Sequence, residues 1–261
     1  MRQGCHFYPT CKTSIFVFAL LVFCAAPRTG ACNSNEHVPW PQYGNIAPLP
    51  GAGIAIDADG RPDGLGALQI NIPVAYNPRS AYFFFSAYSG NYTNVHNEVF
   101  GNGSGVFGVT FGSRPRIYIS AMQVSRDIGE AKALSCQVML ADEAPNRPAI
   151  AVGMQDVLKK EPDGRSLYAV FTKAVAVSDT QVYATLGYGG GRFLDHVFGG
   201  LSAPLGGHFN LAAEWDGFQL NTGLAWRPRG RDGKLTVLGG YNGRAGWLVG
   251  VGMTLDLRSP R

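Results

Sequence analysis

Charged side chains are scarce in this sequence. Asp, Glu, Lys and Arg make up 15% of its 261 residues, against about 25% in ordinary soluble domains. Three of the four net positive charges, Arg2, Lys12 and Arg28, lie within residues 1–31, so the rest of the chain is close to neutral. Nucleic-acid binding needs a basic patch, and this class of partner is therefore not expected.

Long hydrophobic runs are also missing. The longest, Ile15–Ala26, is too short for a transmembrane helix but has the length of a signal-peptide core, and no acid occurs before Glu36. These features predict a signal peptide over residues 1–31. An alternative fate for Cys32 is lipidation, although Thr29 stands where a lipobox prefers Leu.

Cysteine and histidine provide no metal-binding pattern. Beyond residue 31 only Cys32 and Cys136 occur, with no CxxC, and His96, His196 and His208 form no HxH or HxxxH pair. We expect a lone buried Cys136 on a strand, with a Cys32–Cys136 disulfide as the alternative. No metal and no cofactor is expected.

Catalytic signatures are equally sparse. Asp156, Glu214 and Asp216 are acids of the type that glycosidases use, but Asp216 is accounted for by a turn and Asp156 by a strand end. His208 and Asp216 lie eight residues apart on one expected strand, which is about 26 Å and too far for a hydrogen bond. Gly187–Gly191 lacks the Lys-Ser/Thr and the helix of a phosphate loop. The sequence therefore predicts no catalytic residue and no enzyme.

The strongest positive signal is a hairpin over His208–Arg227. Asp216-Gly217 separates two alternating runs, which predicts a two-residue type I′ turn with Glu214 opposite Gln219 and Ala212 opposite Asn221. One face would be apolar, formed by Phe209, Leu211, Ala213, Trp215, Phe218, Leu220, Thr222, Leu224 and Trp226. The other would carry His208, Asn210, Glu214, Gln219, Asn221 and Arg227.

Strand signals recur from Leu65 onward, and no helical period persists. Because bacterial barrels usually have an even number of strands, we expect about twelve and regard the short Val197–Ala203 as the false one. The candidate strands are Ala67–Ala75, Ala81–Tyr88, Gly105–Gly112, Arg116–Ser125, Ala131–Ala141, Pro148–Val157, Ser166–Val175, Gln181–Gly189, Val197–Ala203, His208–Asp216, Phe218–Arg227, Lys234–Tyr241 and Trp247–Leu257.

The distribution of side chains on these strands favours a membrane barrel. One face is apolar with aromatic residues near its ends, and the other is small or uncharged, whereas a soluble sandwich would place Lys and Glu outside. The sequence thus predicts an all-β, transmembrane antiparallel up-and-down β-barrel over residues 65–257. Residues 32–64 would form a Pro/Gly-rich linker or inward-folded segment, 258–261 a short tail, and Ser89–Ser104 an outer loop.

Polar residues on the inward face predict a network in the lumen. Its candidate members are Glu214, Gln219, Asn221 and Arg227, with Lys173 if its strand turns that residue inward. Charges in a narrow lumen need partners, so we expect Glu214 to pair with one inward cation. The alternative is a set of solvated residues without pairing.

Between Ala149 and Trp226 the sequence resembles the YjbH-like family of bacterial outer-membrane β-barrels, which are associated with exopolysaccharide production. The matching stretches are Ala151–Asp156, Ser166–Lys173, Thr185–Gly189 with Gly191–Phe193, Phe198–Gly200, Ala213–Gly217 and Asn221–Arg227.

The resemblance implies a location in the outer membrane of a Gram-negative bacterium. It also implies contacts with membrane lipid, the barrel-assembly machinery and polysaccharide or export components. Passive solute passage fits the same sequence. The alternatives are a secreted soluble β-barrel that binds a small apolar ligand, and an outer-membrane enzyme acting on lipid or glycan.

Overall fold

The structure is a computed structural model that describes residues 48–62, 65–88, 103–112, 115–124, 132–159, 165–228, 234–243 and 246–255. Within these ranges the chain is all-β, with twelve strands and one short 3₁₀ helix, η2 (Gly191–Phe193). The strands are β1 (Ala81–Tyr88), β2 (Gly103–Phe111), β3 (Arg116–Val124), β4 (Lys132–Ala141), β5 (Ala149–Gln155), β6 (Ser166–Val177), β7 (Thr180–Gly189), β8 (His196–Leu205), β9 (Phe209–Trp215), β10 (Leu220–Trp226), β11 (Leu235–Asn242) and β12 (Gly246–Leu255).

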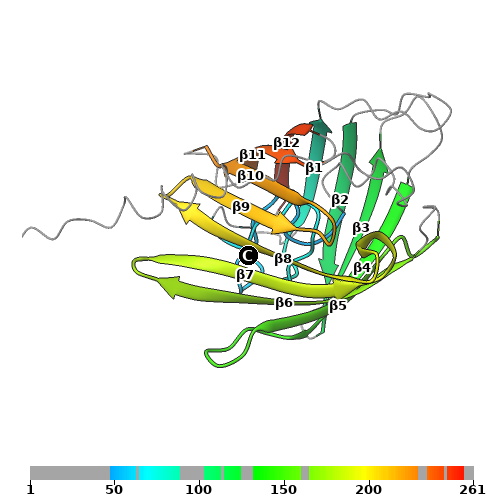
Figure 1. The fold of residues 1–261 in the computed structure, drawn as a ribbon, viewed down its shortest axis with the longest axis horizontal. Coiled ribbons are helices and arrows are strands. Elements are labelled where there is room, and N and C mark those ends of the chain that lie inside the picture. The colour runs from blue at the N-terminus through cyan, green and yellow to red at the C-terminus, as the bar shows by residue number, and fades with distance from the viewer. Residues whose placement is uncertain are drawn as a thin grey trace, which may run out of the picture. The chain divides into compact units, whose positions relative to one another are not determined.

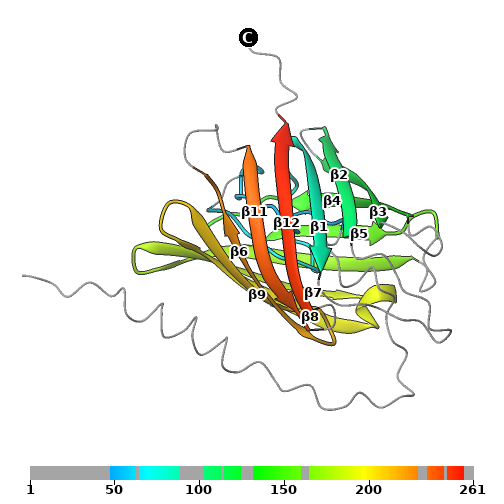
Figure 2. The same ribbon diagram turned by 90° about the horizontal axis from the view of Figure 1, so that it is seen from above.

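The strands form a closed barrel in simple up-and-down order (Figure 1). Each strand pairs antiparallel with its neighbours in sequence, and β12 pairs with β1, as Figure 2 shows. Closure leaves no unpaired edge that would invite association with another chain. The expected up-and-down barrel of about twelve strands is confirmed.

The two ends of the barrel are defined by the directions of β1 and β12. The near end is where β1 begins at Ala81 and β12 finishes at Leu255, and the far end is where β1 finishes and β12 begins. Residues 1–47, most of the Ser89–Ser104 loop and the tail after Leu255 lie outside the described residues, so the predicted signal peptide, the state of Cys32 and the outer loop stay predictions.

The false strand among the thirteen candidates is the first one and not the suspected Val197–Ala203. Val197–Ala203 lies within β8, a strand of 10 residues. By contrast, Ala67–Ala75 joins no sheet and makes only isolated bridges, such as Ala52 with Gln69 and Ile56 with Ala67. The apolar side chains that suggested a strand are buried inside the barrel, and the segment does not pair with a neighbouring strand.

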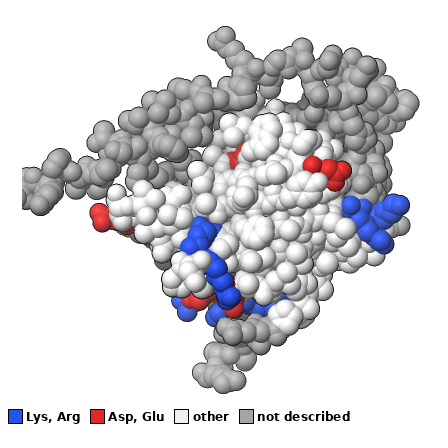
Figure 3. All heavy atoms as spheres, turned by 60° about the horizontal axis from the view of Figure 1, so that its bottom comes forward, with Lys and Arg blue, Asp and Glu red and all other residues white. Residues whose placement is uncertain are grey.

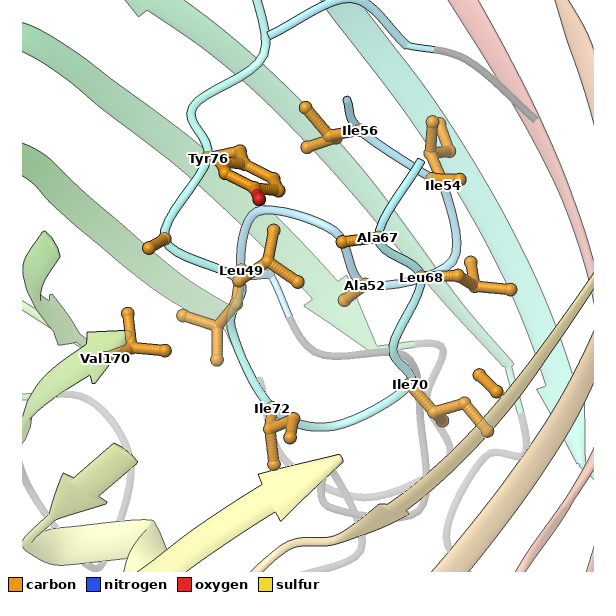
Figure 4. Packing of buried hydrophobic residues seen from close by; sticks show 14 of the residues in the cluster. Leu49, Ala52, Ile54, Ile56, Ala67, Leu68, Ile70, Ile72, Tyr76 and Val170 are labelled. Atoms are coloured by element: carbon orange, nitrogen blue, oxygen red, sulfur yellow. The ribbon is translucent and has the colours of Figure 1, made fainter. Parts of the chain in front are cut away.

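The described part of residues 48–80 runs inside the ring of strands (Figure 1), and we call this segment the plug. Leu49, Ile56, Leu68, Ile70 and Ile72 are all completely buried. Figure 4 shows these apolar side chains on the loops of the plug, and they belong to one buried cluster with Val170 of β6. Inward folding, one of the two expectations for the N-terminal segment, is thus observed from residue 48.

Side chains along the strands point alternately to the predicted inward and outward faces. In β12, Trp247, Val249, Val251 and Met253 point outward, while Leu248 is buried. In β7, Leu186 is exposed and Thr185 is buried. Cys136 lies on β4 as predicted, but it is half-buried instead of buried because it belongs to the outward set.

The Gly-rich inward positions are filled by aromatic side chains from neighbouring strands. A Cβ at Gly153 would lie 2.2 Å from the hydroxyl oxygen of Tyr168, its cross-strand partner. A Cβ at Gly187 would lie 2.3 Å from the ring of Phe198, again directly opposite. Aromatic rings that cover facing glycines support a strongly curved sheet.

The hairpin predicted over His208–Arg227 is present, but its turn is longer than expected. β9 ends at Trp215 and β10 begins at Leu220, so Glu214 lies opposite Asn221 and not Gln219. A type I′ turn needs positive φ at both loop positions, and only Gly217 adopts it, at +107°. The pairing is displaced by an even number of residues, so the inward and outward faces are retained.

Candidate functional site

The lumen is the candidate site, because inward side chains of the barrel wall bind the main chain of the plug there. Ser202 accepts the amide of Leu68 at 3.0 Å, and Thr172 accepts that of Ala75 at 2.9 Å. Gln137 donates to the carbonyl of Val74 at 3.0 Å, and Asn210 donates to that of Gly66 at 2.7 Å. The wall therefore satisfies plug main-chain groups that burial would otherwise leave without partners.

Glu214 on β9 makes the central contact with the plug. Its carboxylate accepts the amides of Ile70 at 2.8 Å and Asn71 at 2.6 Å, and the Asn221 side chain at 3.1 Å. The partners that the described residues supply are amides, so the predicted pair with an inward cation is not formed there. Glu214 is also 1% exposed, which excludes the alternative of a solvated residue.

Two further predicted members join Glu214 at the far end. Asn221 also donates to Asp216 at 2.9 Å, and Gln219 donates to Asp216 at 3.1 Å and to Asn242 at 3.2 Å. Burial raises the pKa of Asp216, against the opposing effects of the hydrogen bond from Asn221, the charge of Arg192 and the hydrogen bonds from Gln219. The Asp216 carboxylate thus links the β9–β10 turn to the wall.

The remaining two predicted members lie elsewhere. Arg227, just past the near end of β10, donates to the plug carbonyl of Pro62 at 3.1 Å. Lys173 falls on the outward set of β6, between inward Thr172 and Ala174, and so is not a lumen residue. It forms an ion pair with Glu143 at 3.1 Å instead.

Glu143, in the turn between β4 and β5, is a plug-binding residue that the sequence did not reveal, and its neighbour Asp142 acts on the plug through Arg116. Glu143 accepts a hydrogen bond from the hydroxyl of Tyr76 in the plug. Asp142 is paired with Arg116, which donates to the plug carbonyl of Asp59 at 3.1 Å. In sequence these acids are part of an ordinary polar turn, and only the position of the plug gives them a role.

The η2 segment lies at the far end of the barrel, between β7 and β8. Arg192 is almost completely buried and donates from its backbone amide to Ser166 at 2.8 Å and from its guanidinium to Gln155 at 2.6 Å. Phe193 stacks on Phe198 with ring centroids 4.4 Å apart. The Gly-rich stretch before η2 thus continues into a 3₁₀ turn and a strand, without the helix that a phosphate loop requires.

The catalytic candidates do not form a reactive group in the described residues. Glu214 is engaged with the plug, while His208 and Asp216 flank opposite ends of β9. Within the described ranges no set of three or more His, Cys, Asp or Glu residues is placed to hold a metal. No helix in the described part of the chain has the length and apolar character needed to cross a membrane.

No protein-family model, curated protein or solved structure matches this chain.

Proposed function

We propose that this chain is an outer-membrane β-barrel of a Gram-negative bacterium. We further propose that it is of YjbH-like type, not an enzyme, and acts in the export or assembly of exopolysaccharide. Its partners would be outer-membrane lipid, the barrel-assembly machinery, and polysaccharide or export components.

The observation that carries the membrane location is the apolar outer wall. Large apolar side chains point outward from strands all round the barrel, including Phe85, Leu140, Leu167, Leu186 and Val249. Figure 3 shows a broad face without charged side chains, with Lys, Arg, Asp and Glu toward its margins. Lipid is the solvent that favours such a surface.

Aromatic side chains at both ends of the strands support the same proposal. Tyr241 and Trp247 contact each other at the far end, with centroids 5.5 Å apart. Phe209 and Trp226 are paired at the near end, and all four are more than a third exposed. Barrels in bilayers carry such girdles at the two interfaces, where amphipathic rings contact the headgroups.

The plug favours a closed barrel over a passive pore. A soluble ligand-binding barrel, the alternative, would need a polar exterior and an apolar cavity, whereas here the exterior is apolar and the lumen holds the plug. The exopolysaccharide role depends on the sequence resemblance, which covers β5 to β10 and not the plug. We therefore keep the cellular role separate from the membrane location in the test.

The location is tested by membrane fractionation followed by gel electrophoresis of boiled and unboiled samples. We expect the protein in the outer-membrane fraction, with a different mobility before boiling because the barrel resists detergent. A soluble periplasmic protein whose mobility is unchanged by boiling would contradict the proposal and favour the ligand-binding barrel. The role is tested by exopolysaccharide output in a deletion strain, which should fall and return on complementation.

A further inference from the structure

We propose that the plug is a displaceable gate, which leaves the lumen through the near end of the barrel when the β4–β5 turn releases it. The inference rests on the proposed function in one respect, since an emptied lumen is a passage only if the barrel spans a membrane. The displacement itself is a property of the chain in any environment that keeps the barrel folded.

The barrel is complete without the plug. The ladder between β12 and β1 pairs Ala81 with Leu255 through Tyr88 with Leu248, and no plug residue takes part. The plug is held by separate hydrogen bonds from wall side chains such as Ser202 and Thr172, by the two amide contacts of Glu214, and by burial of its apolar side chains. None of these contacts belongs to the strand ladder, so the plug can leave without opening the sheet.

The closed state contains a buried polar side chain that destabilises it. Gln69 in the plug is completely buried, and neither its amide nitrogen nor its amide oxygen has a hydrogen-bonding partner among the described residues. Its amide group lies against Gly200 of β8, where a Cβ would be 2.5 Å from its oxygen. Burying an unpaired amide is costly, and water would satisfy it once the plug leaves. Gln69 therefore shifts the equilibrium toward displacement.

Gln137 of β4 is the opposite case within the same lumen. It is also completely buried, but it donates to Val74 at 3.0 Å and to Asn77 at 2.8 Å in the plug. Tyr168 donates to its oxygen at 3.0 Å. Gln137 thus stabilises the closed state while Gln69 destabilises it, although the two side chains are chemically identical.

Contacts at the near end determine the direction in which the plug would leave the lumen. Within the described residues, the plug continues into the wall at Ser80–Ala81, which lies at the near end and serves as the hinge. At that same end Glu143 accepts a hydrogen bond from the hydroxyl of Tyr76, and Arg116, which is paired with Asp142, donates to the plug carbonyl of Asp59. These contacts form a latch. At the far end Arg192 donates hydrogen bonds to the wall residues Gln155 and Ser166, which fix the η2 segment to the wall there.

The lining of the emptied lumen indicates what it would pass. The inward wall is rich in hydroxyl and amide groups, such as Ser120, Ser135, Thr172, Ser202 and Asn210. These groups hydrogen-bond to water once they lose the plug. The passage would therefore carry small hydrophilic solutes.

The test measures how fast a thiol reagent reaches the plug in the folded protein in detergent micelles. Ile72→Cys, a completely buried plug position, is placed in a chain whose native cysteines are all replaced by Ser. Gln69→Met and Gln137→Met are then compared in that background. Labelling should slow by on the order of tenfold with Gln69→Met and quicken by on the order of tenfold with Gln137→Met.

Two controls separate gating from unfolding. A cysteine at outward Val249 should react equally fast in all variants, and the unboiled barrel band should persist. Because Gln137→Met could damage the wall, the latch variant Tyr76→Phe provides a second test and should also quicken labelling. Equal labelling rates in all variants, or a shift of Gln69→Met and Gln137→Met in the same direction, would overturn the gate.

Planar-bilayer conductance then distinguishes failure of the gate from failure of the proposed function. A gate in a membrane barrel gives current that rises with Gln137→Met and falls with Gln69→Met. If labelling follows the expected order but the protein does not insert into bilayers, the displacement stands and the membrane location fails. If the protein inserts into bilayers while Gln69→Met and Gln137→Met leave the labelling rate unchanged, the membrane location stands and the gate fails.

Discussion

At the scale of single residues, the stability of the barrel depends on glycines whose missing Cβ leaves room for a neighbouring side chain. Gly187 and Gly239 are both strand glycines without positive φ, but a Cβ at Gly187 would collide with Phe198 while a Cβ at Gly239 would meet nothing within 4 Å. Gly187→Ala should lower the free energy of unfolding by about 1–3 kcal/mol, because a packed ring must move. Gly239→Ala, the matched control, should be near neutral. The measurement is the temperature at which the unboiled band disappears, and equal effects would contradict this packing.

Also at the scale of single residues, Glu214 holds the plug because both of its carboxylate oxygens accept hydrogen bonds. Glu214→Gln keeps the size but turns an amide N–H toward the donors Ile70 and Asn71. We expect a loss of about 1–3 kcal/mol in stability, for an unpaired buried donor. The same substitution in a chain that lacks the plug should cost much less, and an equal loss in both chains would show that Glu214 acts within the wall.

At the scale of elements, the plug and the wall are separable. The strand ladder closes through β1 and β12 without plug residues, while the plug contributes buried apolar side chains such as Leu68 and Ile72. Deletion of residues 48–76 should therefore leave a barrel that still changes mobility on boiling but unfolds at a lower temperature. In planar bilayers the shortened barrel should conduct steadily, because the plug no longer closes its lumen. Absence of any unboiled barrel band would show that the plug is required for closure.

At the scale of the whole molecule, the outer wall decides which solvent the barrel occupies. Val251 lies in β12 with its side chain outward, whereas Asp179 is exposed in the turn between β6 and β7. Val251→Arg should destabilise the barrel by about 2–4 kcal/mol in a bilayer. In water the same change should stay within about 0.5 kcal/mol.

The control for this prediction introduces the same residue outside the apolar band. Asp179→Arg should leave stability and membrane insertion unchanged in either solvent. Unfolding in liposomes, followed by denaturant titration, compares the two variants. Equal and small effects of both substitutions would favour the soluble barrel.

The sequence by itself determined the local alternation on the strands, because side chains in a β-strand point alternately to opposite faces. From that period the faces of β7, β9, β10 and β12 could be predicted, and the scarcity of charge on the strands together with the aromatic strand ends indicated the barrel. It also identified Glu214 and Asn221 as inward polar residues, and the structure places them together.

Only the tertiary structure decided what the inward groups face. Ala67–Ala75 has the alternation of a strand, but the ring closes through β1 and β12, and this segment is left to fill the lumen. Lys173 and Glu143 acquire their roles from a turn and a plug distant in sequence. The periodicity of the sequence cannot indicate such contacts, because they depend on which segment of the chain occupies the lumen. For the same reason Glu214 binds backbone amides of the plug where the sequence suggested a cation.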